Sequence, residues 1–159
     1  MPQSRNSLKK PISYCLLLIA ISFIASCSTD SQPTNKLLKN LNDEDLSGSW
    51  LVINYWASWC KPCIAEIPEL NSFAAETNNT KVYAVNYDGI TGEQLLAAAS
   101  RLNIQFPLLE TDPATSIAYP RPSVLPTTII ISPEGELTAT LIGPQTRDSL
   151  NHAVNPDTQ

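Results

Sequence analysis

The sequence predicts an α/β domain of three layers, in which helices cover both faces of a central mixed sheet. Strand-like apolar runs alternate with helical segments through residues 51–102, and two further strand-like runs follow around a short turn. In addition, 43% of the chain is hydrophobic, which is enough for the core of one domain. Strands joined through a helix run parallel and strands joined by a tight turn run antiparallel, so the sheet contains both arrangements.

The first strand and the first helix have the clearest patterns. Residues 51–56 (LVINYW) form a nearly continuous apolar run, which is typical of a strand buried on both faces of a sheet. A helix is predicted from residue 60 to about residue 77, and Pro68 inside it predicts a kink. Its apolar positions recur at helical spacing: Ile64, Ile67, Leu70, Phe73 and Ala74.

The remaining elements follow in the order that a mixed sheet requires. A second strand is predicted over residues 81–86, and a helix that Thr91 is expected to cap over residues 91–102. A short apolar segment follows at 106–109. Residues 132–136 (SPEGE) then predict a hairpin turn between two strands at 127–131 and 137–142, and a closing helix is expected at 146–154.

The amino-terminal segment has the features of an export signal. Residues 1–10 carry three basic residues and no acid, and the apolar run at 12–25 is shorter than the ~20 residues that a membrane-spanning helix needs. The run ends in Ile24-Ala25-Ser26-Cys27, which resembles the lipobox of bacterial lipoproteins. An ordinary signal-peptidase site after small residues is the alternative interpretation.

The lipobox resemblance implies where the protein resides. A signal peptide would span residues 1–26, Cys27 would carry the lipid, and a polar tether would follow over residues 27–45. The domain proper would then span residues 46–155. The expected location is the bacterial cell envelope, with the domain facing the periplasm; Ser28 after the cysteine favours the outer membrane.

The charge of the chain excludes one class of partner. All 15 acidic residues lie after Cys27, together with seven of the ten basic ones, so this part has a net charge of about −8. Contacts to phosphate need clusters of Lys and Arg, and the charge therefore argues against nucleic acid as a partner. The acids are scattered, which indicates a solvated surface, and we expect a monomer.

The cysteines point to redox chemistry. If Cys15 leaves with the signal peptide and Cys27 is lipidated, Cys60 and Cys63 are the remaining thiols. A disulfide between them would close a very small ring, which stabilises a fold little, so a purely structural bond is the weaker interpretation. A zinc site needs about two more ligands, and His152 is the chain's single histidine, so no metal and no cofactor are expected.

The Cys60-Lys61-Pro62-Cys63 motif lies between a buried strand and the start of a helix. Free N–H groups and the positive end of the helix dipole favour a thiolate at Cys60, and Lys61 adds a positive charge. Pro62 fits the first helical turn, where its missing N–H costs nothing. We therefore expect Cys60 to be the exposed attacking sulfur and Cys63 to resolve the mixed disulfide, with Trp59 shielding the pair.

Residues 52–63, which contain this motif, resemble the active-site strand and turn of the thioredoxin superfamily, in its exported TlpA/ResA-like branch. The resemblance covers about residues 46–154 and implies a thioredoxin-like fold with thiol:disulfide oxidoreductase activity. It places the family's helix-kinking proline at Pro68 and its cis-proline at Pro126. Leu125 would then offer its backbone to an extended substrate. The implied partners are exported thiol or disulfide proteins, such as apocytochrome c, and a membrane electron donor.

One departure from the family leaves the acid–base group open. Asn54 occupies the place where cytosolic thioredoxins carry a buried aspartate. Asp88 lies near the position of an acid in exported relatives, although an Asp before Gly89 is also typical of a simple turn. The Lys-Pro pair does not fix the direction of electron flow. A disulfide oxidase or isomerase, and a non-catalytic binding module on the same scaffold, therefore remain as alternatives to a reductase.

Overall fold

The computed structural model describes residues 36–42 and 48–156. The predicted signal peptide, Cys15 and the predicted lipidation site Cys27 lie outside these residues. Within the two described ranges, no helix is both long and apolar enough to cross a membrane.

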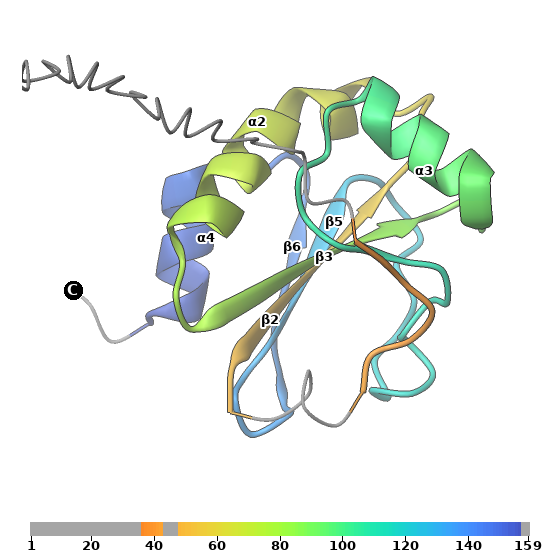
Figure 1. The fold of residues 1–159 in the computed structure, drawn as a ribbon. Coiled ribbons are helices and arrows are strands. Elements are labelled where there is room, and N and C mark those ends of the chain that lie inside the picture. The colour runs from red at the N-terminus through yellow and green to blue at the C-terminus, as the bar shows by residue number, and fades with distance from the viewer. Residues whose placement is uncertain (1–35, 43–47, 157–159) are drawn as a thin grey trace, which may run out of the picture. The chain divides into compact units, whose positions relative to one another are not determined.

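A six-stranded mixed sheet forms the centre of the domain (Figure 1). Its order is β1-β4-β3-β2-β5-β6; β1, β4, β3 and β2 run parallel to one another, and β5 is antiparallel to both β2 and β6. The strands are β1 (Leu37–Leu38), β2 (Trp50–Trp56), β3 (Thr80–Asn86), β4 (Leu108–Leu109), β5 (Thr127–Ile131) and β6 (Leu137–Ile142). The helices are α2 (Lys61–Glu76), α3 (Gly92–Arg101) and α4 (Arg147–Val154). The predicted α/β class with a central mixed sheet is confirmed, and every predicted strand and helix is present within a few residues.

The central strand β2 divides the core into two halves. All its residues after Trp50 are buried, which explains the continuous apolar run in the sequence. Alternate side chains point to opposite faces: Val52 and Trp56 join one buried cluster, and Leu51, Ile53 and Tyr55 join the other. Both faces of the sheet are therefore covered.

The structure corrects the expectation that helices cover both faces. Among the described residues, the buried side chains of α2, α3 and α4 all belong to the cluster that contains Val52, so the three helices lie on one face (Figure 1). The other face is covered by the segment around Ala114 and Tyr119, which has no regular helix. The reason is topological. The crossovers β2–α2–β3 and β3–α3–β4 step in the same direction across the sheet, and right-handed crossovers then put both helices on one side.

The structure also corrects the boundary between tether and domain. Leu37 and Leu38, which the sequence suggested were part of a flexible tether, form the edge strand β1 and pair with Leu108 and Leu109. The backbone N–H of Glu110 donates to the carbonyl of Leu38 at 2.9 Å, which continues the ladder. The domain therefore includes residues before position 46.

Helix ends follow the expected chemistry with one exception. Thr146 begins α4 with a full capping box, in which its side chain accepts from the N–H of Ser149 and the Ser149 side chain accepts from the N–H of Thr146. Thr91 precedes α3 as predicted, but its side chain makes no capping hydrogen bond. Instead, the Glu110 carboxylate accepts the N–H of Gly92 at 2.6 Å.

Candidate active site

The two cysteines of the motif lie where β2 ends and α2 begins. They form a disulfide with a Cα–Cα distance of 5.3 Å. Cys60 is the N-cap of α2, and its sulfur accepts the backbone N–H of Cys63 at 3.2 Å. Cys60 is 4% exposed and Cys63 is fully buried. The predicted order of accessibility is therefore present, but Cys60 is far less exposed in the disulfide state than we expected.

The side chains around the disulfide are open to solvent. Trp59 is 64% exposed, and Lys61 and Pro62 are exposed as well. Ile64 follows on the outer side of α2 and is 37% exposed. Large apolar side chains at the surface are informative when they gather around one feature, and here two of them flank the disulfide.

Asp88 holds Trp59 in place. The indole N–H of Trp59 donates to both carboxylate oxygens of Asp88, at 3.0 and 3.2 Å. Asp88 itself lies in the turn after β3, where its backbone N–H donates to the Asn86 side chain at 3.0 Å. Asp88 is thus a turn residue, and among the described contacts its carboxylate bonds to an aromatic ring rather than to a sulfur.

The Leu125–Pro126 peptide bond is cis, as the family resemblance implied. Antiparallel pairing of Tyr55 with Thr127 brings the start of β5 next to the end of β2, so Pro126 lies beside the strand end that leads into the disulfide. Pro126 is buried, and Leu125 packs against the cluster that contains Cys60 and Cys63. Leu125, Pro126 and the disulfide therefore share one edge of the sheet.

A buried acid that the sequence analysis missed lies one helical turn after Cys63. Glu66 is 2% exposed, and its Oε1 accepts the side-chain N–H of Asn54 at 2.8 Å. Its Oε2 accepts the backbone N–H of Gln145, also at 2.8 Å. Burial raises the pKa of Glu66 from 4.5 to about 6, although both hydrogen bonds act in the opposite direction.

Asn54 binds this acid instead of providing one. Its side-chain N–H group also donates to the hydroxyl of Thr128, its cross-strand partner, at 3.1 Å. The helical spacing did contain a signal for Glu66: residues three apart share a helix face, so Glu66 lies on the same face as Cys63 and one turn before the buried Leu70.

Polar contacts on the opposite face of the sheet fix the segment that leads to Pro126. The buried Tyr55 hydroxyl donates to Asp112 at 2.5 Å and lies 2.9 Å from the hydroxyl of Tyr119. Arg121 pairs with the same Asp112 carboxylate at 2.7 Å and donates to the backbone carbonyl of Tyr87 at 2.7 Å. Burial raises the pKa of Tyr55, so its hydroxyl remains protonated and continues to donate. The Arg121 contact joins this segment to the turn that carries Asp88.

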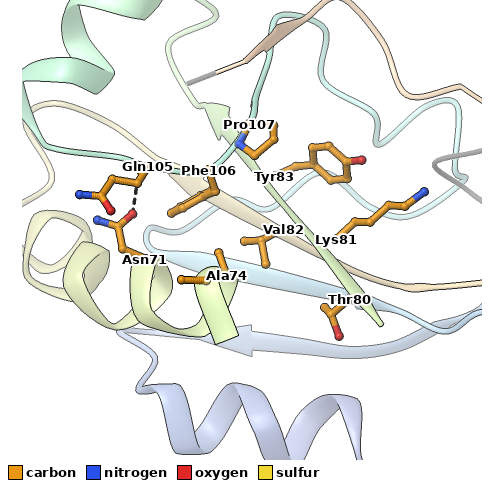
Figure 2. A pocket seen from close by; sticks show the side chains of 10 residues that line it. Asn71, Ala74, Thr80, Lys81, Val82, Tyr83, Gln105, Phe106 and Pro107 are labelled. Atoms are coloured by element: carbon orange, nitrogen blue, oxygen red, sulfur yellow. Dashed lines mark hydrogen bonds between the residues drawn. The ribbon is translucent and has the colours of Figure 1, made fainter. Parts of the chain in front are cut away.

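A groove of about 300 Å³ lies at the other end of β3 (Figure 2). It runs between the second half of α2 and residues Thr80–Tyr83, with Phe106 and Pro107 on its wall. Asn71 spans it, because its side-chain oxygen accepts the N–H of Gln105 at 2.8 Å. The groove is remote from the disulfide, because β3 reaches the active edge at its carboxyl end, and we assign it no part in the chemistry.

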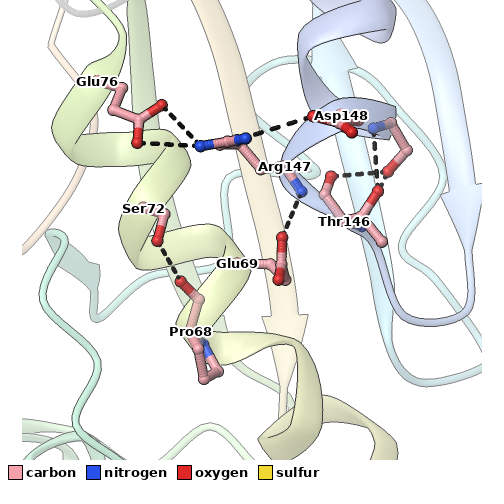
Figure 3. Close-up of polar contacts among 8 residues, drawn as sticks. Pro68, Glu69, Ser72, Glu76, Thr146, Arg147 and Asp148 are labelled. Atoms are coloured by element: carbon pink, nitrogen blue, oxygen red, sulfur yellow. Dashed lines mark hydrogen bonds and ion pairs between the residues drawn. The ribbon is translucent and has the colours of Figure 1, made fainter.

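Helices α2 and α4 are joined by charged contacts (Figure 3). The Glu69 carboxylate accepts the backbone N–H of Arg147 at 2.9 Å, in the first turn of α4. The Arg147 guanidinium lies 3.3 Å from Glu76 and 3.7 Å from Asp148. These pairs are exposed, so each contributes little stability, but together they fix where α4 begins. Across the described part of the chain, no three or more His, Cys, Asp or Glu side chains gather as a metal site.

Comparison with known proteins identifies the family of this chain. The AhpC/TSA family profile matches residues 25–140. The chain is 30% identical over 141 residues to thiol-disulfide oxidoreductase ResA of Bacillus subtilis, covering 82% of this chain and 76% of that protein. It is 27% identical over 150 residues to sporulation thiol-disulfide oxidoreductase A of the same organism, covering 86% and 91%.

Solved structures agree with the sequence comparison. The crystal structure of StoA from Bacillus subtilis has a TM-score of 0.55 at 25% identity and covers 67% of this chain and 83% of that one. The solution structure of a putative thioredoxin from Neisseria meningitidis has a TM-score of 0.57 at 25% identity, covering 70% and 76%. The chain therefore belongs to the AhpC/TSA family of thioredoxin-like proteins, as a thiol-disulfide oxidoreductase of the ResA and StoA type.

Proposed function

We propose that Cys60 and Cys63 are the catalytic dithiol, with Cys60 attacking the substrate and Cys63 resolving the intermediate. The observation that carries this proposal is the difference between the two bonded sulfurs. Cys60 caps α2 and retains 4% of its surface, whereas Cys63 retains none. A substrate sulfur can approach only the first of them. The helix start also stabilises negative charge there, which favours the thiolate as nucleophile or leaving group.

The reaction is a two-electron exchange in two steps. In the reducing direction, the Cys60 thiolate attacks a substrate disulfide, one S–S bond breaks as another forms, and the departing substrate thiolate takes a proton. The Cys63 thiol then loses its proton and attacks the Cys60 sulfur. The second substrate thiolate leaves, and the disulfide seen in the structure results. The substrate is reduced and the enzyme is oxidised.

We propose Glu66 as the group that accepts the Cys63 proton. The two side chains are three residues apart on α2, on its buried face, where neighbouring side chains are about 5–6 Å apart at Cβ. A carboxyl group with a pKa of about 6 can exchange protons near neutral pH. Asp88, the acid that the sequence suggested for this role, is exposed and occupied by Trp59. We therefore assign Asp88 the positioning of Trp59.

The substrates that we propose are exported proteins with accessible cysteines. Trp59, Lys61 and Pro62 would form one side of the substrate groove, and Leu125 and Pro126 the other. The exposed apolar side chains of Trp59, Ile64 and Val124 favour a polypeptide over a small polar thiol. The haem-binding cysteines of apocytochrome c are one candidate substrate.

The proposed setting is the bacterial envelope, with a lipid anchor at Cys27 facing the periplasm and a membrane electron donor that reduces the disulfide again. A monomer that works as a reductase fits this setting best. The names of the relatives, ResA and sporulation thiol-disulfide oxidoreductase A, support the exchange chemistry rather than its direction. A disulfide oxidase or isomerase is the second candidate.

The decisive experiment is mixed-disulfide trapping. Cys63→Ser should accumulate a covalent complex with the substrate through Cys60, whereas Cys60→Ser should trap none. Wild-type protein should also reduce insulin in the presence of dithiothreitol. If neither complex nor turnover appears, the chain uses its scaffold for binding alone. The measured reduction potential then decides the direction, since values for this fold run from about −270 mV for reductants to about −120 mV for oxidants.

A further inference from the structure

The turn between β6 and α4, residues 143–146, touches the buried acid and the proline loop at once. The backbone N–H of Gln145 donates to Oε2 of Glu66 at 2.8 Å. Two residues earlier, the backbone N–H of Gly143 donates to the carbonyl of Pro126 at 2.9 Å. This bond continues the antiparallel ladder of β5 and β6, and Gly143, whose φ of 91° suits glycine, is where the chain leaves β6 and enters the turn.

The side chain of Gln145 fixes that shape. Its Nε2 donates to the backbone carbonyl of Gly143 at 2.8 Å, which closes the turn on itself. Its Oε1 accepts the hydroxyl of Ser149 at 2.9 Å, which ties the turn to the capping box of α4. Gln145 is only partly exposed, and each polar atom of its side chain has a partner within the same short segment. The turn is therefore cross-linked by the Gln145 side chain and tied to the start of α4.

Protonation of Glu66 must disturb this arrangement. As a carboxylate, Glu66 accepts one N–H on each oxygen, from Asn54 and from Gln145. A protonated carboxyl carries a hydrogen on one oxygen, and that oxygen then faces an N–H donor as a poor acceptor. One of the two bonds weakens. Asn54 retains Thr128 as a second acceptor, whereas the Gln145 N–H has no other partner among the described contacts.

We propose that Gln145 is a positioning residue that couples the ionisation of Glu66 to the Pro126 carbonyl, and thereby to the binding of polypeptide substrates. The ionised carboxylate accepts the Gln145 N–H, and the Gln145 side chain donates to the Gly143 carbonyl. The Gly143 N–H in turn donates to the carbonyl of Pro126, beside the disulfide. When Cys63 gives its proton to Glu66, the same turn loosens its hold on Pro126 as the reduced substrate leaves. This coupling rests on the proposed function of the dithiol and of Glu66.

The direct path from Glu66 to Pro126 runs through Gln145 and Gly143, because the other charged groups nearby are engaged elsewhere. The strands beside it contribute the neutral side chains of Asn54 and Thr128. The titratable and charged side chains on the helices nearby are Cys63 and Glu69 on α2 and Arg147 and Asp148 on α4. The Glu69 carboxylate accepts the Arg147 backbone N–H, and the Arg147 guanidinium pairs with Glu76 and Asp148 at the surface. None of these contacts includes a Glu66 oxygen.

The first test measures the titration of Glu66 directly. Gln145→Met keeps the length of the side chain but removes both of its hydrogen bonds, so the Gln145 N–H should be held less firmly against the carboxylate. In a ¹³C NMR titration of the oxidised protein, the Glu66 midpoint should rise by roughly 0.5–1 pH unit. Gln94→Met, on the exposed side of α3, should leave the midpoint unchanged. An unchanged midpoint in Gln145→Met overturns the coupling.

The second test compares a peptide disulfide with a small one at pH 7.5. We expect Gln145→Met to raise KM for the peptide disulfide roughly three- to tenfold and to change KM for bis(2-hydroxyethyl) disulfide little, because only the peptide is long enough to bind along the Leu125–Pro126 loop. Any effect of the altered Glu66 ionisation on kcat should be common to both disulfides. In a Glu66→Gln background the same change should have little further effect on KM. A full, additive effect in that background would show that Gln145 acts without Glu66 and would overturn the proposal.

The two tests separate this proposal from the function on which it rests. If wild-type protein exchanges neither disulfide, the proposed function fails, while the NMR titration still decides whether Gln145 controls Glu66. If exchange is normal and the Gln145→Met midpoint does not move, the coupling alone fails.

Discussion

Glu66 offers the sharpest physical prediction, because its pKa in the folded protein differs from that in the unfolded chain. Burial raises it from 4.5 to about 6. The native state therefore holds this proton more tightly than the unfolded chain does. As pH rises through 4.5 the unfolded chain ionises first, and the native state follows near pH 6. The free energy of unfolding must fall across this window.

The magnitude follows from the difference between the two values, 4.5 and about 6. Each pH unit corresponds to about 1.36 kcal/mol, so ionisation of Glu66 lowers the free energy of unfolding by about 2 kcal/mol between pH 4 and pH 7. Glu66→Gln cannot ionise and loses this dependence. A comparison of the stability of Glu66→Gln with that of wild-type protein at a single pH does not isolate the charge, because the amide also changes the hydrogen bonds to Asn54 and Gln145. The pH dependence of the difference isolates the charge.

The assay is urea unfolding of the oxidised wild-type protein and of Glu66→Gln at several pH values from 4 to 8. The variant minus wild-type difference should increase by about 2 kcal/mol from pH 4 to pH 7, which exceeds the extrapolation error of such measurements for a domain of ordinary stability. Glu134→Gln, in the exposed turn before β6, serves as the control. A difference that stays flat from pH 4 to pH 8 would refute the reasoning that burial governs the ionisation of Glu66.

Two further predictions concern the support of the site. Tyr55→Phe removes the hydroxyl that donates to Asp112 and contacts Tyr119, and it should lower the free energy of unfolding by about 1–3 kcal/mol, since the buried Tyr119 hydroxyl and the partly buried Asp112 carboxylate each lose a partner; unchanged stability would mean that the network does not anchor this face. Leu37→Asn should destabilise the domain by about 1–2 kcal/mol in the same urea assay because β1 packs on the core, whereas the exposed Lys39→Asn should stay within about 0.5 kcal/mol. Equal effects of the two substitutions would place β1 outside the cooperative unit.

The parts of the fold that the sequence predicted are those with strong local patterns. β2 is a continuous apolar run and α2 repeats its apolar residues at helical spacing, so each is visible in a short window. β1 has only two residues within a polar stretch, and its strand character comes from pairing with Leu108 and Leu109, far along the chain. No local pattern contains that information. The placement of α2 and α3 on one face, by contrast, follows from the handedness of two successive crossovers once the strand order β4-β3-β2 is known.

The residues of the candidate site also divide into those that the sequence predicted and one that it missed. The dithiol and the proline loop have characteristic neighbours in the sequence, so Cys60, Cys63 and Pro126 could be named before their geometry was known. Glu66 was missed because a glutamate on an amphipathic helix is usually a surface residue. Its burial depends on donors from β2 and from the turn before α4, which are 12 and 79 residues away in the chain. Helical spacing from Cys63 was the available signal.

In the proposed reaction the Cys60 sulfur exchanges disulfides, and in the structure the same sulfur caps α2 by accepting the Cys63 N–H at 3.2 Å. An ionised sulfur accepts a hydrogen bond more strongly than a neutral one, so this cap is stronger in the reduced protein with Cys60 as thiolate. Reduction and unfolding form a closed thermodynamic cycle. Whatever stability the cap adds to the reduced form must therefore reappear as a higher electrode potential, at about 30 mV for every 1.4 kcal/mol. The reduction potential of this protein therefore reports how much more strongly the Cys60 sulfur caps α2 in the reduced protein than in the oxidised one.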